Sequence, residues 1–409
     1  MEGILSFSVL VAALGYFVDI YDLLLFGIVR VPSLKSLGVA GPDLLQQGVF
    51  LLNMQMTGLL IGGVLWGILG DKRGRIQVLF GSILLYSVAN LCNAGVTTVM
   101  QYGILRFIAG IGLAGELGAA ITLVTEKMHQ TKRGYGTAVV AGVGLTGAVA
   151  AGTVAQILDW RTCYVIGGLM GLMLLILRIK MAESGIFLAV QKDAKDANGN
   201  PVRRGDLRLL FSSRARVVRF ARCILIAVPI WYVIGILITF APEFGRELGI
   251  TEPIIAAKSI GYTYAGVCVG DLTTGALSQY IKSRKKIIIA SLIANVILIP
   301  VFLMAKGVTA STLYAICVCL GLAGGYWAVF MTTTAEQFGT NLRATVTTAV
   351  PNLVRGAVVP LTLSFSALRM HYSLRESAAW VGVVTFAIAF VAAFGLKESY
   401  QTDLDYLEV

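Results

Sequence analysis

Long blocks of apolar residues recur along the whole chain, and each is about 20 residues or more in length. A block of this length crosses a bilayer as a helix, at a rise of about 1.5 Å per residue. Helices are expected because hydrocarbon offers no water to satisfy an extended backbone. The sequence therefore predicts twelve membrane-spanning helices, over residues 7–31, 48–70, 76–96, 98–127, 134–158, 160–181, 217–241, 256–281, 287–305, 309–336, 345–368 and 377–396.

Composition agrees with a membrane protein. Of 409 residues, 57% are hydrophobic and 13% are charged, whereas soluble domains have about 45–50% apolar and about 25% charged residues. No Lys or Arg precedes Arg30, but a secretory signal peptide needs a basic segment before its apolar region. We therefore expect residues 7–31 to be an uncleaved first helix.

The net charge of +11 is unevenly distributed. Isolated basic residues such as Lys35, Arg161 and Lys306 fall in the connections on one side of the predicted membrane. Most of the others fall on the opposite side: Lys72, Arg73, Arg75, Lys127, Lys132, Arg133, Lys282, Arg284, Lys285, Arg343 and the basic residues of the 182–216 segment. Because cytoplasmic loops carry the excess of Lys and Arg, we expect a bacterial inner-membrane protein with both termini cytoplasmic. The bilayer accounts for the charge without a nucleic-acid partner.

A polar stretch divides the chain into two halves. Residues 182–216 predict a cytoplasmic linker between a bundle over 1–181 and a bundle over 217–409 that ends in a short cytoplasmic tail. An internal repeat supports this division: Gly112-Leu-Ala-Gly115 recurs as Gly321-Leu-Ala-Gly324. We therefore predict an all-α membrane protein with two pseudo-symmetric six-helix bundles around a central cavity, where transporters of this design bind near the midplane.

Several motifs resemble those of the major facilitator superfamily. Gly67-Ile-Leu-Gly-Asp-Lys-Arg-Gly-Arg75 is similar to its signature loop between helices 2 and 3, and Arg106-Phe-Ile-Ala-Gly-Ile-Gly112 to its helix-4 motif. Glu183-Ser184 resembles the metabolite:proton symporter and sugar porter branches, although Gly185 stands where they usually have Pro. The second-half loop 278–286 lacks the Asp and glycines of its counterpart. The resemblance implies a secondary transporter that works by alternating access.

Two acids lie within the first predicted helix. Asp19 and Asp22 are spaced i, i+3, which places them on one face. A carboxylate in the membrane is costly unless it is hydrated, paired or protonated, so we expect these acids to carry protons. They also resemble the helix-1 pair of aromatic-acid:proton symporters. The alternative is that one of them only pairs with Arg106 and locks two helices together.

Helix 4 supplies two further candidates. Arg106 keeps its charge and needs an anion nearby, and its level in the membrane allows it to reach Asp22. If Asp22 pairs with Arg106 in one state and binds a proton in another, it couples proton movement to transport. A permanent ion pair between the two would not. Glu116, among small residues, is either a second proton site or a hydrogen-bonding group facing helix 1 or 2.

Helix 11 contains a buried arginine between two prolines. Pro351 and Pro360 loosen the helix around Arg355, as tolerated where a helix lines a cavity. Because a guanidinium fork suits a carboxylate, we expect Arg355 to bind the negative group of a substrate. The alternative is an ion pair with Asp271 or another acid of the second half.

Aromatic and amide side chains accompany these charges and complete the predicted substrate site. Tyr326-Trp327, after Gly324-Gly325, has the strongest indication of lining the cavity, although aromatic residues also serve as packing or as the interfacial belt. With Arg106 and Arg355, the predicted substrate-binding residues are Tyr21, Trp231, Tyr232, Tyr326, Trp327 and Asn352.

Three acid–base pairs fall at predicted cytoplasmic helix ends, where we expect a gate. An exposed ion pair contributes only about 0–1 kcal/mol, which suits a gate that must open. The alternative is that the basic residues only set the topology. The predicted pairs are Asp71 with Arg75, Glu126 with Arg133, and Glu336 with Arg343.

The remaining patterns favour import driven by the proton gradient, with no cofactor and no metal. Helix 5 lacks the Gly-Pro motif typical of drug exporters of the superfamily, and there is no Walker-type loop. The two His and six Cys form no nucleophile–base or metal-ligand pattern, which argues against an enzyme. We predict a monomeric proton symporter for a small organic anion, a carboxylate or a polycarboxylate such as a siderophore. The alternatives are an exporter or uniporter of a zwitterionic osmolyte, sugar or drug, or a non-transporting receptor.

Overall fold

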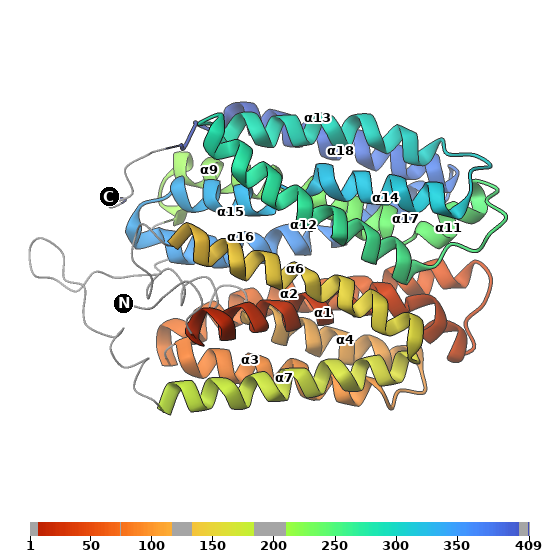
Figure 1. Ribbon diagram of the computed structural model, residues 1–409, viewed down its shortest axis with the longest axis horizontal. Helices are drawn as coiled ribbons and strands as arrows, with labels where there is room; N and C mark the ends of the chain where they lie inside the picture. The colour runs from red at the N-terminus through yellow and green to blue at the C-terminus, as the bar shows by residue number, and fades with distance from the viewer. Residues whose placement is uncertain (1–6, 74, 117–132, 184–209, 401–407, 409) are drawn as a thin grey trace, which may run out of the picture.

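The computed structural model describes residues 7–73, 75–116, 133–183, 210–400 and 408, and this part of the chain is built from helices (Figure 1). The helices of the first half are α1 Phe7–Ser36, α2 Asp43–Arg73, α3 Arg75–Asn93, α4 Val99–Leu113, α6 Arg133–Ile157 and α7 Trp160–Glu183. Those of the second half are α9 Arg214–Leu225, α10 Val228–Tyr232, the π-helix η2 Val233–Ile238, α11 Ala241–Glu247, α12 Ala256–Tyr280, α13 Arg284–Leu303, α14 Ala310–Gly324, α15 Trp327–Glu336, α16 Thr340–Gly356, α17 Val358–Leu368 and α18 Leu374–Gly395.

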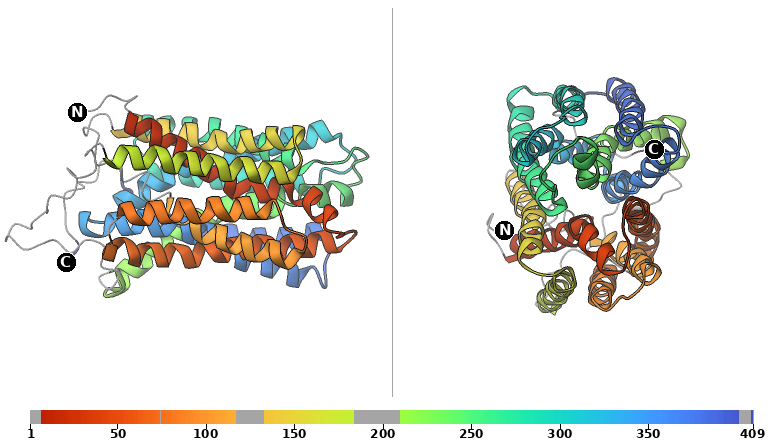
Figure 2. Two further views of the ribbon diagram at one scale, coloured as in Figure 1. Left: turned by 90° about the horizontal axis from the view of Figure 1, so that it is seen from below. Right: turned by 90° about the vertical axis from the view of Figure 1, so that its right-hand side faces the viewer.

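The helices run roughly parallel and form two groups, which the end view separates by colour (Figure 2, right). In the first group α1 packs on α6 and α7, and α4 packs on α2 and α3. In the second group α14 packs on α12 and α13, and α18 packs on α10, α13 and α17. Because α1 begins and α18 ends on one side of the molecule (Figure 1), we call that side the Phe7 end and the opposite side the Ser36 end.

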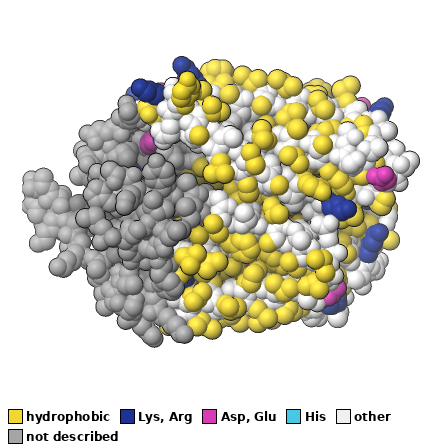
Figure 3. Space-filling model, in the orientation of Figure 1, with side chains coloured by type: hydrophobic (Ala, Val, Ile, Leu, Met, Phe, Trp, Pro, Cys, Tyr) yellow, Lys and Arg dark blue, Asp and Glu magenta, His cyan; other side chains and the backbone are white. Residues whose placement is uncertain are grey.

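The outer surface is that of a protein that crosses a membrane several times. On the face shown in Figure 3 the charged side chains lie towards the two ends, with apolar side chains between them. Within the described residues, eight helical segments are long and apolar enough to span a bilayer. They are Leu10–Ser36, Asp43–Trp66, Trp160–Ile179, Arg214–Ile238, Arg284–Leu303, Ala310–Glu336, Thr345–Leu368 and Leu374–Gly395. Shorter apolar helices cover Val78–Asn93, Val99–Leu113 and Gly142–Ile157.

Close helix packing recurs at glycines in the two halves. A Cβ atom added to Gly110 of α4 would collide with the carbonyl oxygen of Gln55 in α2, and one added to Gly321 of α14 would collide with that of Thr263 in α12. Small residues let helix backbones approach in a membrane, where dispersion contacts replace the hydrophobic effect as the main attraction. The same device therefore joins the second and fourth long helical segments of each half.

Three of the predicted continuous helices are interrupted beside the centre of the molecule, and one of them, predicted at 345–368, is divided at Ala357 into α16 and α17. The segment predicted at 217–241 is divided into α9, α10, η2 and α11, with Pro229 and Pro242 in the first turns of α10 and α11. A proline has no backbone N–H and therefore interrupts the helical hydrogen bonds to the preceding turn. The segment predicted at 309–336 breaks at Gly325, where a Cβ atom would lie 2.6 Å from Cα of Gly270. Tyr326 Oη joins the breaks in the 217–241 and 309–336 segments by donating to the carbonyl of Ile226 at 2.8 Å.

The two halves meet along two seams. In one, α12 packs against α1 and α6, and in the other α2 packs against α16 and α17. Hydrogen bonds cross at and beside the second seam: Thr362 Oγ1 donates to Asn53 Oδ1 of α2 at 2.6 Å, and Asn352 Nδ2 donates to the carbonyl of Ala114 at the end of α4 at 3.0 Å. Relative movement of the halves must break and remake such contacts.

Candidate functional site

A small cavity of about 20 Å³ lies between the two halves, and it is large enough for about one water molecule. Residues of α1 and α6 form one wall, while the interrupted helices, α12 and α16 form the other. The lining residues are Tyr16, Ile20, Leu145, Ile230, Trp231, Ile234, Tyr264, Val267, Gly324, Trp327 and Arg355. The described part of this cavity has no room for a metabolite, so the helices must separate before one can bind there.

Arg355 is bound by an acid of the opposite half. Its Nη2 lies 3.3 Å from Oδ2 of Asp19, and both side chains are at least 99% buried. The guanidinium carbon also lies 6.0 Å from the ring centroid of Trp327. In the described part of the chain, Arg355 Nε and Nη1 and Asp19 Oδ1 have no hydrogen-bond partner. The partner of Arg355 is thus neither Asp271 nor another second-half acid, and its fork keeps donors for a further anion.

Asp22 and Arg106 lie in the same buried region without a direct ion pair among the contacts that the structure describes. Asn90 of α3 connects them: it accepts a hydrogen bond from Arg106 Nη2 and lies close to Asp22. Arg106 also lies over the ring of Tyr164, 4.5 Å from its centroid. Both carboxylate oxygens of Asp22 and two nitrogens of Arg106 have no hydrogen-bond partner among the described residues. A buried acid in this situation is stable only if it is protonated, hydrated or paired in another state.

Glu116 lies just beyond the end of α4 and is paired with Arg178 of α7. Oε1 of Glu116 contacts Nη2 of Arg178, and Oε2 accepts from Nη1 at 3.3 Å. Both side chains are at least 97% buried. Among the contacts of the described residues, Glu116 bonds to neither helix 1 nor helix 2. Sequence reasoning did not single out Arg178, because its position near a helix end is typical of a topology signal.

Asp271 caps a helix that begins inside the molecule. Its Oδ1 accepts a hydrogen bond from the backbone N–H of Ala328 at 3.0 Å. Ala328 lies in the first turn of α15, where backbone donors lack partners and the helix dipole attracts negative charge. Asp271 thereby stabilises the interruption that places Trp327 in the cavity wall.

The predicted aromatic and amide residues have different surroundings. Trp231 and Trp327 line the cavity. Tyr232 Oη donates to the carbonyl of Ala378 in α18 at 2.7 Å, Tyr21 Oη donates to that of Cys163 in α7 at 3.2 Å, and Tyr326 joins two of the helix breaks. Asn352 bonds to the end of α4 beside the second seam. The structure therefore brings two of these residues together with Arg355, and the cavity adds Tyr16 and Tyr264, which the predicted set lacks.

The predicted gate lies mostly outside the described residues. This holds for Glu126 and for the side chains of Asp71, Arg75 and Arg133. Glu336 forms an ion pair with Arg284 of α13 at 3.4 Å and accepts from Ser399 Oγ. Arg343 Nε donates to the carbonyl of Ala335 at 3.1 Å. The gate stays a prediction.

An inter-half ion pair that sequence reasoning missed lies towards the Ser36 end. Arg30 of α1 binds Glu243 of α11 with both arms of its fork, at 2.8 Å and 2.7 Å. Arg30 also donates to the carbonyls of Leu44 and Thr239 and lies 4.7 Å from the ring centroid of Phe240. The side chain of Arg30 is fully buried and that of Glu243 is 8% exposed. We call this pair the Arg30–Glu243 clamp, because it joins the two halves on that side.

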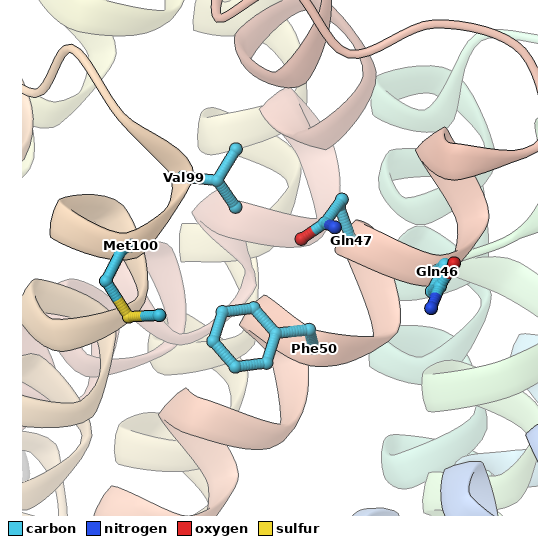
Figure 4. Close-up of a pocket in the computed structure, with 5 residues that line it drawn as sticks. All are labelled: Gln46, Gln47, Phe50, Val99 and Met100. Atoms are coloured by element: carbon cyan, nitrogen blue, oxygen red, sulfur yellow. The ribbon is translucent and has the colours of Figure 1, made fainter.

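A second, larger pocket of about 450 Å³ lies at the surface between α2 and α4. Phe50, Gln46 and Gln47 come from α2, and Val99 and Met100 from the start of α4 (Figure 4). It contains no charged side chain and lies apart from the buried acids and arginines. The described residues also contain no group of three or more His, Cys, Asp or Glu placed to hold a metal ion.

Comparison with known proteins decides the family. A model of the Major Facilitator Superfamily matches residues 5–359. The chain belongs to this superfamily. The transporter is 26% identical to a putative metabolite transport protein of Haemophilus influenzae, over 96% of each chain. It is 25% identical to a gentisate transporter of Corynebacterium glutamicum, over 94% of this chain and 86% of that protein.

Solved structures agree on the fold. The crystal structure of a D-xylose-proton symporter matches with a TM-score of 0.71 at 18% identity, over 97% of this transporter and 99% of that chain. The all-α fold of twelve membrane helices in two bundles, predicted from the apolar blocks and the repeat, is thus confirmed. So is the prediction that the protein is a multi-pass membrane transporter of small molecules and not an enzyme.

Proposed function

We propose that the transporter imports a small organic anion together with protons, by alternating access between its two halves. The observation that carries this proposal is the ion pair between Asp19 and Arg355 at the cavity. It joins an acid of one half to the only kind of side chain that cannot lose its charge. A substrate carboxylate that takes over the fork of Arg355 releases Asp19 and thereby weakens a contact between the halves.

Charge balance supports proton coupling. Apart from Asp271, which is engaged with the start of α15, the described part of the buried centre contains three acids, Asp19, Asp22 and Glu116, and three arginines, Arg106, Arg178 and Arg355. An anion that enters this balanced set adds one negative charge in a medium where an uncompensated charge costs several kcal/mol. Uptake of one proton by one of the acids restores neutrality. The proton gradient is then the energy source, and no bound cofactor is required.

The cavity walls favour an anion with an apolar body. Trp231, Trp327, Tyr16 and Tyr264 surround the arginine, and aromatic faces pack well against planar rings. Gentisate, the substrate named for one relative, is a ring with a carboxylate and hydroxyl groups. We therefore infer a monocarboxylate with a ring as the substrate class, ahead of a polycarboxylate such as a siderophore.

The location follows from the charge distribution of the sequence. We propose the cytoplasmic membrane of a bacterium, with the Phe7 end and both termini in the cytoplasm, and a monomer as the working unit. The bundles then cover 1–181 and 217–409, with 182–216 as a cytoplasmic linker. The Arg30–Glu243 clamp would face the outside and the pairs around Asp71 the inside.

Purified transporter in liposomes tests this function. Gentisate, benzoate, glycine betaine and D-xylose are offered with an acidic outside or with equal pH. We expect accumulation of a carboxylate only with the pH gradient, and its loss when a protonophore is added. Equal rates with and without the gradient would indicate a uniporter. Accumulation of the carboxylate in vesicles that are acidic inside, in exchange for protons that leave, would indicate a proton-driven exporter. Transport of betaine or xylose alone would overturn the substrate class.

A further inference from the structure

Asp19 has a second arginine close to it besides Arg355. A Cβ atom added to Gly15 of α1 would collide with Nη2 of Arg178 and with Oε1 of Glu116. Gly15 is one helical turn from Asp19, on the same face of α1, and Arg178 is close enough to Asp19 to interact with it electrostatically. The missing side chain at Gly15 is what allows the Glu116–Arg178 pair to lie against this face.

These four side chains form an alternating row of charges. Arg355 contacts Asp19, Asp19 faces Arg178, and Arg178 contacts Glu116. The row begins at the cavity on α16, crosses α1, and ends between α7 and α4. Since Gly15 precedes Asp19 on a helix that starts at the Phe7 end, the row runs from the substrate cavity towards the Phe7 end.

We propose that Arg178 is the cation to which Asp19 turns when a substrate carboxylate occupies Arg355, and that Glu116 then takes up the coupled proton. This inference rests on the proposed function and assigns its proton site. Before binding, two arginines and two carboxylates cancel. After binding, Arg355 holds the substrate, Arg178 holds Asp19, and Glu116 is neutral because one proton has bonded to its carboxylate. The row stays neutral in both states, so the substrate enters only with a proton.

Other charged and titratable groups lie beside this row. Tyr86 of α3 faces Glu116, Tyr16 faces Asp19 and Arg355, and Asp22 lies near Asp19. Asp271 faces Tyr16 but is engaged with the start of α15. Arg178 is therefore a positioning residue: it contacts Glu116, lies near Asp19 and does not line the cavity.

Proton uptake on substrate binding tests the exchange. Benzoate and gentisate are added to the purified, weakly buffered transporter with a pH indicator. We expect the wild type to take up about one proton per bound monocarboxylate. In the pH range where that proton is taken up, its affinity for the carboxylate should fall about tenfold for each unit that the pH rises. Glu116→Gln is expected to bind with little proton uptake and less than about twofold change in affinity over the same range. Arg178→Lys, which keeps the charge, should retain proton uptake, as should Glu376→Gln at the exposed start of α18.

Separate outcomes distinguish this inference from the proposed function. Failure of the wild type to bind a carboxylate, or binding without proton uptake, overturns both. Wild-type coupling that persists unchanged in Glu116→Gln overturns only the assignment to Glu116 and Arg178. If Glu116→Gln does not fold, infrared difference spectra provide the test. Substrate binding should produce the band of a protonated carboxyl group. The frequency of this band should shift in Glu116→Asp and stay unchanged in Asp22→Glu. The reverse pattern rejects the proposal.

Discussion

Asp19 of α1 and Arg355 of α16 form a fully buried ion pair across the two halves, with Oδ2 and Nη2 3.3 Å apart. Breaking such a pair by removing one partner typically costs about 3–5 kcal/mol, because an isolated charge is left buried. A cost of that size leaves the separated state below about 1% of molecules when no anion is bound. A substrate anion that replaces Asp19 compensates most of the loss, so opening becomes linked to occupancy.

Replacement of Asp19 by Asn should separate binding from transport. Arg355 loses its competitor, so we expect the affinity for a carboxylate such as gentisate to rise about tenfold, or by about 1.4 kcal/mol, while net uptake is lost. Arg355→Gln should abolish binding. Isothermal titration and liposome uptake measure the two effects. Unchanged affinity in Asp19→Asn would mean that the acid and the substrate do not share Arg355.

Asp22→Asn should remove proton-driven accumulation and leave counterflow, because we expect protons from the Ser36 end to pass Asp22 on their way to Glu116. Counterflow exchanges one substrate for another with no net proton movement, so it needs only a site that reorients. The expectation rests on a buried carboxylate with no hydrogen-bond partner among the described residues, beside Arg106 and Asn90. Full accumulation against the gradient by this variant would exclude a role of Asp22 in coupling.

Glu243→Gln should loosen the Ser36 end. The variant leaves the fully buried Arg30 without its charged partner, which favours conformations in which Arg30 reaches water. A cysteine placed at the buried Ser33, one turn from Arg30, should react several-fold faster with a membrane-impermeant thiol reagent than in the parent. Its matched control is the exchange Arg30→Glu with Glu243→Arg, which restores opposite charges. Equal labelling of all three proteins would argue against a clamp.

Asp71→Asn should slow transport more than it weakens binding. The acid belongs to the predicted gate, where pairs worth about 0–1 kcal/mol each bias the closed state without contacting the substrate. The maximal uptake rate should fall several-fold with a nearly constant half-saturation concentration. A variant with a normal rate would leave only the topology role for this loop.

Glu398 offers a test in a region outside the spanning helices. Burial, which would raise its pKa, is outweighed by hydrogen bonds from Ser283 Oγ and the N–H groups of Arg284, Tyr400 and Ser399, which hold the pKa below its usual range. An acid whose pKa is lowered by folding stabilises the folded state at pH values above its unfolded pKa of about 4.3. This stabilisation is lost as the pH falls through the lower pKa of the folded state. Glu398→Gln should melt earlier than the wild type at pH 7, and the difference should shrink below pH 4. A constant difference would contradict the assignment.

The sequence predicts single residues well where burial alone makes them unusual. An arginine between two prolines and two acids on one helical face are recognisable without a fold, and the structure buries all three. Which arginine meets which acid depends on helix rotation and on which helices adjoin, and spacing along one helix contains neither. Arg178 and Arg30 went unrecognised for this reason: each lies near a helix end, where a basic residue is normally a topology signal.

The interrupted helices show another limit of the sequence. Pro229 and Pro242 indicate a weakened helix, but apolar residues continue across the breaks, so hydropathy predicts one segment. The break before Trp327 depends on Gly325 meeting Gly270 and on Asp271 capping α15, which are contacts between residues far apart in the chain.

A structure with a bound carboxylate tests the central claim most directly, through the distance between Asp19 Oδ2 and Arg355 Nη2. We predict that both arms of Arg355 bind the carboxylate of the ligand and that the separation grows from 3.3 Å to well beyond ion-pair range. A ligand bound elsewhere while Arg355 and Asp19 remain paired would contradict the account.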